Sequence, residues 1–479
     1  MENAVMQAPA APAAPRQKLP LPPGLLSKPD CPAARALAKT GNFYVFLKDM
    51  GREFGDVVSL SPELFLLVPS AMIKEALRNT KDYRKANSIE IFKILAGEGL
   101  FTAEGELYDR QERVVKSAFG KKYFAEFRRI IEEDVASYMD EAFARARAKG
   151  ETVCVSDMSV DLTMSIAARA FFGIGGETEL ARAFRKGLVF IQDWFAQLQS
   201  ADFAAPMLRS IEDRYIRLPV LRSWQRALLR SVTGAGEVAK AVAAWKAYAA
   251  DNDLKAHETE AQMRGLCARI IVLRRKDPGS LDKNDVLSSL LRFQNDPGNT
   301  WLTDEAVIDE VATFFVAGHE TTSDLFMTLI WKHARGETPR TVVEEIENAV
   351  DMIGEEQFLF QKYPVTNDYL TQVLLDHPPI PFTVRQTNRE LELGGYFIPK
   401  DAKVLLSPYV TRDIDVNFGS GRRQCIGRVF ALEEAVIGLR HLVRHRLELE
   451  NPGQSLEMTQ GLSIGYSRSR IPVLARPVG

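Results

Sequence analysis

The chain has 479 residues, of which 46% are hydrophobic and 26% are charged, a composition typical of ordinary globular proteins. Its 61 Lys and Arg residues against 63 Asp and Glu residues leave a formal net charge of −2. This balance argues against nucleic acid as a main partner, because phosphate binding needs a basic excess. No apolar run reaches the roughly 18 residues that a membrane span needs, so no transmembrane segment is expected.

Residues 1–24 are rich in proline and alanine and lack the basic-then-apolar pattern of a secretory signal, which predicts a disordered or extended lead-in. No internal repeat or composition shift follows, so residues 25–479 are expected to form a single domain. The four cysteines are widely spaced and form no Cys-x-x-Cys pair, which argues against a zinc cluster or a disulfide framework. A reducing cytoplasm is the expected location.

Helical patterns dominate the chain, and short β segments lie near both ends. Residues 56–68, DVVSLSPELFLLV, predict a small hairpin. Apolar residues then recur at three- and four-residue steps, as in 125–150 and 159–176, which predicts helices. Patterns typical of strands return at 391–409 and 462–477. The expected fold class is mainly α with small β-sheets.

One long helix is expected near the centre of the second half. Its apolar pattern starts after Asp304, a predicted N-cap, and continues to about Ala334, which corresponds to a helix about 45 Å long. Gly318 lies in the middle, where glycine costs about 1 kcal/mol relative to alanine. Thr321 and Thr322 follow as two adjacent poor helix formers. Because these residues disfavour a helix, their place at the centre of a long helix indicates a packing or functional role.

Two interpretations of this interruption stay open. In the first, Gly318 lines a groove that a flat ligand approaches, and Glu320 with Thr321 forms a proton relay beside it. In the second, Gly318 allows a neighbouring helix to pack closely, and the threonine hydroxyls bond back to helix carbonyls.

The segment FGSGRRQCIG, residues 418–427, leads through two glycines and two arginines into a cysteine. A phosphate-binding loop is excluded, because Gln424 replaces the third glycine of a dinucleotide fingerprint and no Gly-Lys-Ser/Thr follows. A long amphipathic helix begins just after Cys425, so free backbone N–H groups and the cations Arg422 and Arg423 would lower the pKa of its thiol. The pattern favours a thiolate that binds a metal over an inert buried cysteine.

Two histidines, His441 and His445, lie four residues apart near the end of that helix. A zinc-binding helix would carry a glutamate directly after the first histidine, but Leu442 stands there. The pair is therefore interpreted as the solvated basic end of the helix.

Upstream, HPPIPFTVRQT (377–387) predicts a turn followed by a short strand that carries Arg385. Together with AGHETT (317–322) and the cysteine segment, it resembles the cytochrome P-450 superfamily, whose motifs stand in the same order. GLFTAEGELYDRQERVVKSAF (99–119) is similar to the C-helix region of that family. The resemblance extends from about Leu19 to the C-terminus. It implies a triangular helical prism with haem b, iron protoporphyrin IX, between the long central helix and the cysteine loop.

The resemblance also implies roles for single residues. Cys425 would be the axial ligand of the iron, in the kind of thiolate-ligated haem that favours O–O cleavage. The backbone groups of Ile426 and Gly427 would temper its sulfur, and Phe418 would pack beneath the haem. Arg423 and Arg385 would pair with the propionates.

On the other face of the haem, the resemblance implies that Glu320 and Thr321 deliver protons to dioxygen. Gly318 would open the groove to oxygen and substrate.

The chain departs from the family pattern in three places. The helix before Pro378 lacks the Glu-x-x-Arg pair, and the meander that should precede the cysteine loop is missing before Phe418. In the family these two elements jointly brace the loop. In the C-helix region Tyr108 replaces the usual Trp and Glu112 replaces a basic residue, so Arg113 or Lys116 would have to compensate near a propionate.

Two segments fall where the family recognises substrate, residues 88–101 and the aromatic stretch near Trp194. They are either ordinary core or the lining of a large apolar pocket. A lining would include Ile91, Phe92, Leu95, Phe190, Trp194 and Phe195. A lipophilic substrate such as a fatty acid, terpenoid or steroid would fit such a pocket.

The function expected from the resemblance is haem-thiolate monooxygenation of a lipophilic small molecule with O2. Because the chain carries no flavin or nicotinamide fingerprint, NAD(P)H electrons would arrive through separate proteins, such as a ferredoxin and its reductase. An acidic ferredoxin would dock on a basic face around Arg422, Arg428 and Arg440. The alternative is a divergent protein of the same fold that binds haem weakly or not at all and acts as a hydrophobic-ligand binder.

Overall fold

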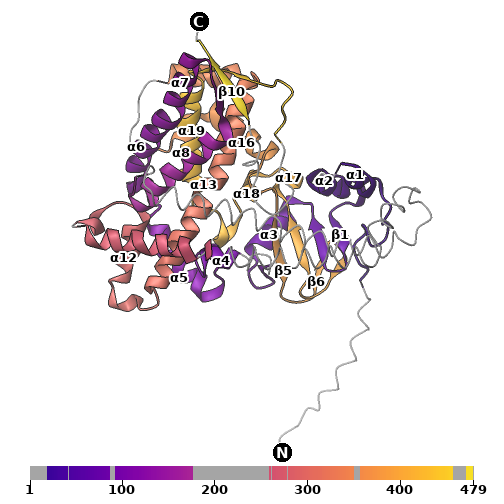
Figure 1. Ribbon diagram of the computed structural model, residues 1–479. Coiled ribbons are helices and arrows are strands. Elements are labelled where there is room, and N and C mark those ends of the chain that lie inside the picture. The colour runs from indigo at the N-terminus through magenta and orange to yellow at the C-terminus, as the bar shows by residue number, and fades with distance from the viewer. Residues whose placement is uncertain are drawn as a thin grey trace, which may run out of the picture.

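The computed structural model describes residues 19–40, 43–86, 92–175, 258–259, 261–277, 279–349, 357–456 and 471–477 (Figure 1). Several sequence-based predictions lie outside these residues. They are the lead-in up to residue 18, residues 462–470 of the predicted strand segment 462–477, and the pocket candidates Ile91, Phe190, Trp194 and Phe195.

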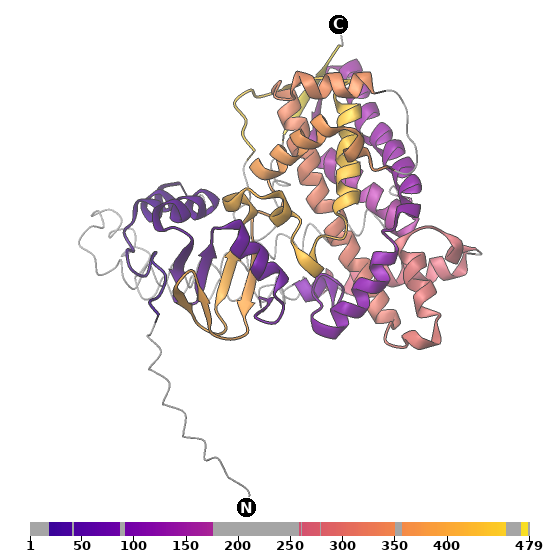
Figure 2. The same cartoon turned by 180° about the vertical axis from the view of Figure 1, so that it is seen from behind.

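A helical lobe surrounds the long helix α13, Asp304–Ala334. This helix packs against α8 (Val155–Phe172), α16 (Pro364–Asp376) and α19 (Arg428–Leu442). Figure 2 shows α19 upright within this lobe, and α6 (Phe124–Val135) lies against it. Side chains from all five helices enter one large hydrophobic core cluster, so α13 is covered on almost every side. The predicted central helix is confirmed.

The start of α13 differs from the prediction. Thr303, not Asp304, is the N-cap, because its Oγ1 accepts a hydrogen bond from the Ala306 N–H at 3.3 Å. Asp304 is the first helical residue, where its carboxylate faces the positive end of the helix dipole.

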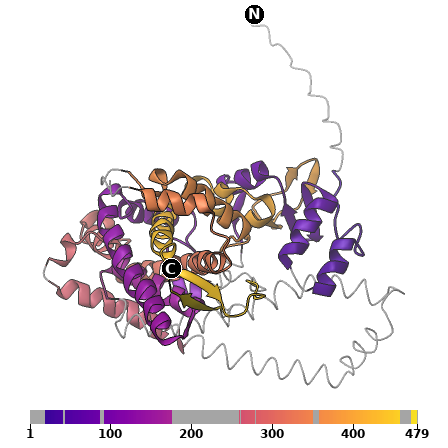
Figure 3. The same cartoon turned by 90° about the horizontal axis from the view of Figure 1, so that it is seen from above.

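A sheet lobe lies beside the helical lobe (Figures 1 and 3). Its five strands run in the order β1-β2-β8-β5-β3. β2 and β8 are parallel, and the other neighbours are antiparallel. The strands are β1 Val57–Ser61, β2 Leu64–Leu67, β3 Tyr83–Lys85, β5 Thr383–Thr387 and β8 Lys403–Leu406. The predicted hairpin at 56–68 is β1–β2 and is confirmed.

The remaining strands are short. β6 (Leu391–Leu393) and β7 (Tyr396–Ile398) form the hairpin that the 391–409 pattern predicts. A three-stranded sheet joins β4 (Thr152–Cys154), β10 (Pro472–Arg476) and β9 (Arg446–Leu449). The mainly α fold class with small sheets is therefore confirmed.

Short helices complete both lobes. The sheet lobe carries α1 Pro32–Thr40, α2 Phe43–Phe54 and α3 Ser70–Arg78. The helical lobe adds α4 Lys93–Ala96, α5 Gly105–Ser117, α7 Glu141–Lys149, α12 Val286–Gln294, α14 Arg340–Asn348 and α15 Leu359–Lys362. Between the lobes the chain forms α17 Pro408–Thr411, α18 Ile414–Asn417 and the 3₁₀ turn η6 Gly421–Arg423.

Part of the predicted lead-in belongs to the folded unit. The Phe397 N–H donates to the Pro20 carbonyl at 2.9 Å, and the Ser59 N–H donates to the Pro23 carbonyl at 2.8 Å. Gly24 bridges to Ser59 with a φ of +146°, where a methyl group would lie 2.2 Å from the Ser59 carbonyl oxygen. The folded part of the chain therefore begins before residue 25, at the sheet lobe.

The predicted helix at 125–150 is continuous but changes pitch. α6 and α7 are joined by a π-helical turn at Ala136–Asp140, a type of turn that often occurs at functional sites. From this turn Asp140 bonds His441 Nδ1 at 2.6 Å and His445 Nε2 at 2.8 Å. The interpretation of these histidines as a solvated helix end is wrong, since His441 is buried and bonded on both ring nitrogens.

Candidate functional site

One short face of α13 is open although the rest of the helix is buried. From Val307 to Trp331 every residue is buried except Ala317, Gly318 and Thr321. Residues 317 and 321 are spaced i,i+4 and residues 318 and 321 are spaced i,i+3, so the three lie on one side of the helix within about one turn. Along this stretch, α13 is accessible only at the AGHETT motif.

Gly318 also lies where α13 meets α8. A methyl group there would be 2.6 Å from Cε2 of Phe171, a ring that is 2% exposed. The hydroxyls of Thr321 and Thr322 donate back to the carbonyls of Ala317 at 3.0 Å and Gly318 at 3.5 Å. These are the contacts of the close-packing interpretation, and they coexist with an open face at Thr321.

The two residues between Gly318 and Thr321 are buried. The ring Nδ1 of His319 lies 2.8 Å from the Phe315 carbonyl, which holds the imidazole along the helix. Glu320 is 5% exposed. Next to the motif lies Glu434 of α19, whose pKa burial raises well above its usual value while Thr322 acts in the opposite direction. The sequence analysis did not find Glu434, because an acid in an amphipathic helix carries no separate signal.

The cysteine loop is a closed turn. The Cys425 N–H donates to the Phe418 carbonyl at 2.6 Å. Gly419 and Gly421 both have φ of +73°, and a methyl group on Gly421 would lie 2.8 Å from Arg78 Cγ. The glycines of the motif therefore allow the turn and its close contact with α3.

The thiol of Cys425 is accessible. Its side chain is exposed, whereas Cys31 and Cys267 are buried, and all four cysteines are free. Desolvation by its surroundings raises the pKa of the Cys425 thiol, against the effect of the Gly427 N–H and of Arg428. An exposed side chain on a closed turn leaves this thiol available to a ligand.

The cations near this thiol differ from the expected ones. The sequence analysis assigned Arg422 and Arg423 to lower the pKa of Cys425, but the arginine that acts on the thiol is Arg428. Arg422 pairs with Asp109 at 2.7 Å, outside the loop. Arg423 turns toward Glu104 at 2.7 Å.

Three cations from separate segments lie close together, namely Lys85, Arg385 and Arg423. Burial, followed by the charge of Arg423, lowers the pKa of Lys85 on β3 to about 7 and the pKa of Arg385 on β5 to about 10. The Arg423 guanidinium lies 5.4 Å from the ring centre of Tyr108. Lys85 and Arg385 are register partners on β3 and β5, Lys85 Nζ lies 5.3 Å from the same ring centre, and Glu104 pairs with Arg423, so these positive charges lie close together.

Lys85 is the member that the sequence analysis missed. Its Nζ donates to the carbonyls of Phe101 at 2.6 Å, Ala103 at 2.7 Å and Leu100 at 3.4 Å. The expected residue, Arg113, is exposed on α5. Lysine on a three-residue strand carries no motif, so only the pairing of β3 with β5 reveals it.

Glu112 lies beside two cations. Its carboxylate is 3.7 Å from Arg422 and 3.8 Å from Lys116, which is one of the two residues expected to compensate for it. Tyr108, in place of the usual Trp, donates its hydroxyl to the Arg422 carbonyl at 2.7 Å. Tyr108 thus supports the cysteine loop directly.

The donor set fits an anionic cofactor. The buried Nε of Arg423 has no hydrogen-bond partner, in a protein where buried donors are usually satisfied. An unpaired buried donor among three clustered cations suits a carboxylate, which accepts charge-assisted hydrogen bonds from a guanidinium. The propionates of a haem, with Cys425 available for the iron, supply this group, and the residues present therefore fit it.

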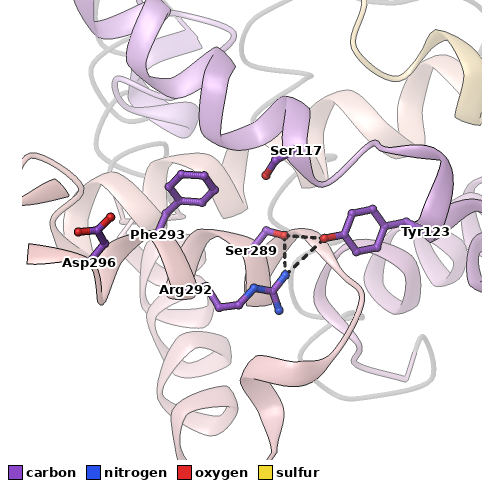
Figure 4. A pocket seen from close by; sticks show the side chains of 6 residues that line it. All are labelled: Ser117, Tyr123, Ser289, Arg292, Phe293 and Asp296. Atoms are coloured by element: carbon purple, nitrogen blue, oxygen red, sulfur yellow. Dashed lines mark hydrogen bonds between the residues drawn. The ribbon is translucent and has the colours of Figure 1, made fainter. Parts of the chain in front are cut away.

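A separate cavity of about 370 Å³ lies beside α12 (Figure 4). In it Arg292 donates to Ser289 Oγ at 3.0 Å and to the Tyr123 hydroxyl at 3.4 Å. It is lined by Ser117, Tyr123, Ser289, Arg292, Phe293 and Asp296, none of which the sequence analysis placed in the site.

Comparison with known proteins decides the family. A family model described as Cytochrome P450 matches residues 22–413, most of the chain. The chain belongs to the cytochrome P450 family. This P450 is accordingly an oxidoreductase of the monooxygenase type. The match ends just before the cysteine loop, at the place where the meander is missing from the sequence.

Curated relatives of this P450 come from bacteria, fungi, plants and an insect. Cyclooctatin synthase of Streptomyces melanosporofaciens is 25% identical over 420 residues, covering 80% of this chain and 81% of the relative. Cyclooctat-9-en-7-ol 5-monooxygenase of the same organism is 24% identical over 417 residues, covering 80% of each. Protein LUTEIN DEFICIENT 5, chloroplastic, of Arabidopsis thaliana is 23% identical over 471 residues, covering 88% and 72%.

Solved structures show the same fold. The retinoic acid bound cyanobacterial CYP120A1 has a TM-score of 0.68 at 19% identity and covers 96% of this chain and 100% of its own. The cytochrome P450DA heme domain has a TM-score of 0.69 at 20% identity, with 96% and 98% covered. In this P450, no helix among the described residues is long and apolar enough to cross a membrane.

Proposed function

We propose that Cys425 binds the iron of haem b and that this P450 hydroxylates or epoxidises a lipophilic small molecule with O2. The observation that carries the proposal is an exposed thiol on the cysteine loop, together with a cation cluster in which the buried Nε of Arg423 has no partner. When bound, the haem supplies the chemistry of oxygen activation, and a thiolate ligand favours O–O cleavage.

The residues of the loop and the sheet lobe would hold the cofactor. Haem binding requires the Cys425 thiolate, and the Gly427 N–H and Arg428 already act to lower the pKa of this thiol. Arg423, Arg385 and Lys85 would bind the propionates. Phe418, which lies 5.1 Å from the Arg428 guanidinium, would pack beside the cofactor.

Residues at the open face of α13 would transfer protons. Thr321 donates its hydroxyl hydrogen to the Ala317 carbonyl, so the lone pairs of its oxygen can accept a hydrogen bond from another donor. Glu320, buried beside it, would supply the proton, and Gly318 would keep the helix surface flat. An acid and an alcohol on adjacent residues suit a short relay.

The names of relatives support the substrate class, and an exposed arginine supports a docking site for the electron donor. The names of two relatives, cyclooctatin synthase and cyclooctat-9-en-7-ol 5-monooxygenase, support an apolar cyclic substrate. NAD(P)H electrons would arrive through a ferredoxin and its reductase. Of the three expected docking arginines, Arg422 is 60% exposed, but Arg440 is 13% exposed and pairs with Glu132 at 2.7 Å. Docking would therefore centre on Arg422.

We also propose a cytoplasmic location, which four free cysteines support. A second candidate function, hydrophobic-ligand binding with weak or no haem, is favoured by the missing Glu-x-x-Arg pair.

The deciding experiment is the carbon monoxide difference spectrum of reduced, purified protein. We expect a strongly red-shifted Soret band, which thiolate ligation produces, and its complete loss in Cys425→Ser. Cys154→Ser, which removes a partly exposed cysteine on β4, is the matched control and should keep the band. Folded protein produced with ample haem but without Soret absorbance would favour the binding function instead.

A further inference from the structure

The cysteine loop returns to the C-terminal end of α16, far away in sequence. Asn417 Nδ2 donates to the Leu374 carbonyl at 2.7 Å. Leu374 belongs to the last turn of α16, where helix carbonyls have no partner within the helix. A side chain just before the cysteine loop therefore caps a helix that ends where the Glu-x-x-Arg pair is missing.

Asn417 also lies at the neck of the loop. It is the last residue of α18, whose first turn Asp413 caps by accepting the Asp415 N–H at 2.9 Å. The next residue, Phe418, accepts the Cys425 N–H. A displacement of Asn417 is thus passed to Cys425 through one peptide unit and one hydrogen bond.

Other polar contacts hold this region from two sides. On the sheet lobe, Lys74 of α3 pairs with Asp413 at 2.8 Å and Arg78 Nε donates to Ser420 Oγ at 2.8 Å. On the helical lobe, the Tyr108 hydroxyl of α5 donates to the Arg422 carbonyl at 2.7 Å, within the loop. Asn417 adds a contact at the neck of the loop with α16, which packs against α13 and α19.

A second link to α16 is weaker. Arg412 pairs with Asp376 at 2.7 Å, but their side chains are 41% and 44% exposed, and exposed ion pairs contribute little. Asn417 is partly buried, and its Oδ1 is a buried acceptor without a partner. Removing the Asn417 amide would leave the Leu374 carbonyl unsatisfied inside the protein, which is costly.

We propose that Asn417 is a positioning residue that holds the Cys425 loop against the end of α16, in place of the brace that this chain lacks. The proposal rests on the proposed function in that Cys425 is taken as the haem ligand. It concerns the placement of the thiol, not contact with substrate.

The test compares Asn417→Ala with Asn299→Ala in the full-length chain as purified. Asn299 is a matched control, because its Nδ2 also donates to a backbone carbonyl, that of Phe293 at 3.0 Å, in a distant turn. Two readouts are taken from each variant. One is the fraction of haem with the thiolate-type Soret band, and the other is the rate of Cys425 alkylation followed by mass spectrometry.

In Asn417→Ala we expect the ratio of thiolate-ligated to other haem to fall roughly tenfold and alkylation of Cys425 to accelerate by a similar factor. Asn417→Gln, which keeps an amide donor, should recover part of both. Asn299→Ala should change neither.

Equal behaviour of Asn417→Ala and Asn299→Ala would overturn the proposal. So would loss of far-UV circular dichroism in Asn417→Ala, because a positioning residue shifts the loop without unfolding the protein. If the parent chain shows no thiolate band while Asn417→Ala still accelerates alkylation, the haem assignment fails and the positioning role stands.

Discussion

Gly318 is a residue at which α13 packs closely against α8. Its hydrogen leaves room for the Phe171 ring, which also packs against Phe119, Phe314 and Phe430. The same residue forms part of the open face beside Thr321. Gly318 thus allows α8 to pack closely on one side and leaves the surface of α13 accessible on the other.

Substitution of Gly318 by alanine tests the packing role. Alanine favours the helix by about 1 kcal/mol, but crowding the Phe171 ring costs about 1–3 kcal/mol, so we expect the free energy of unfolding to fall by about 1 kcal/mol. In a Phe171→Leu background the crowding is gone, and Gly318→Ala should then stabilise the protein. Chemical denaturation of the four proteins measures this coupling. The same sign in both backgrounds would contradict it.

At the scale of elements, the end of α19 is fastened to α6 and to the π turn by ion pairs. His441 bonds Asp140 at 2.6 Å and Glu132 at 2.8 Å, and Arg440 bonds Glu132 at 2.7 Å. Burial lowers the pKa of His441, but the bonds to Asp140 and Glu132 outweigh it and raise the pKa to about 9. The far end of the helix that follows Cys425 is thereby anchored.

This anchor predicts a pH dependence of stability. The pKa of His441 is higher in the folded state than the usual 6.5, so its contribution is complete below pH 6.5 and is lost as the pH rises toward about 9. A shift of this size corresponds to about 3 kcal/mol. Unfolding measured from pH 6 to pH 9 should show this decline in the parent chain, and His441→Asn should flatten it. An unchanged slope in the variant would mean that another group titrates.

At the scale of the molecule, the candidate haem site joins the two lobes. Lys85 and Arg385 come from neighbouring strands of the sheet lobe, whereas Arg423 comes from the loop that precedes α19. Lys85 also holds three carbonyls between α4 and α5. An anion bound among these cations would relieve their repulsion and link the lobes.

Lys85→Met tests this link. Loss of a charged hydrogen-bond donor should weaken haem affinity roughly tenfold. Since the pKa of Lys85 is about 7 without an anion and an anion favours the charged form, the affinity of the parent should fall as the pH rises above 7. Haem transfer to an acceptor protein measures both effects. Lys48→Met, on α2, is the control and should keep the parent profile.

Sequence motifs determined the parts of this P450 whose chemistry lies in neighbouring residues. AGHETT and the cysteine segment each concentrate unusual residues within ten positions, so the central helix and the thiol could be named from the sequence, and the proton relay at Glu320 and Thr321 stays a prediction. Alternating and helical periodicity likewise predicted the hairpins and the fold class, because the spacing of apolar residues along the chain indicates which side of a strand or helix is buried.

Tertiary structure alone decided the parts assembled from distant segments. Lys85 meets Arg423 only through strand pairing, Arg428 rather than Arg422 acts on the thiol, and Asn417 reaches Leu374 across a helix end. His441, expected in solvent, is buried because the π turn brings Asp140 to it. Such contacts depend on how elements pack in three dimensions, and a single side chain on a short strand or helix end carries no periodic signal of its partner.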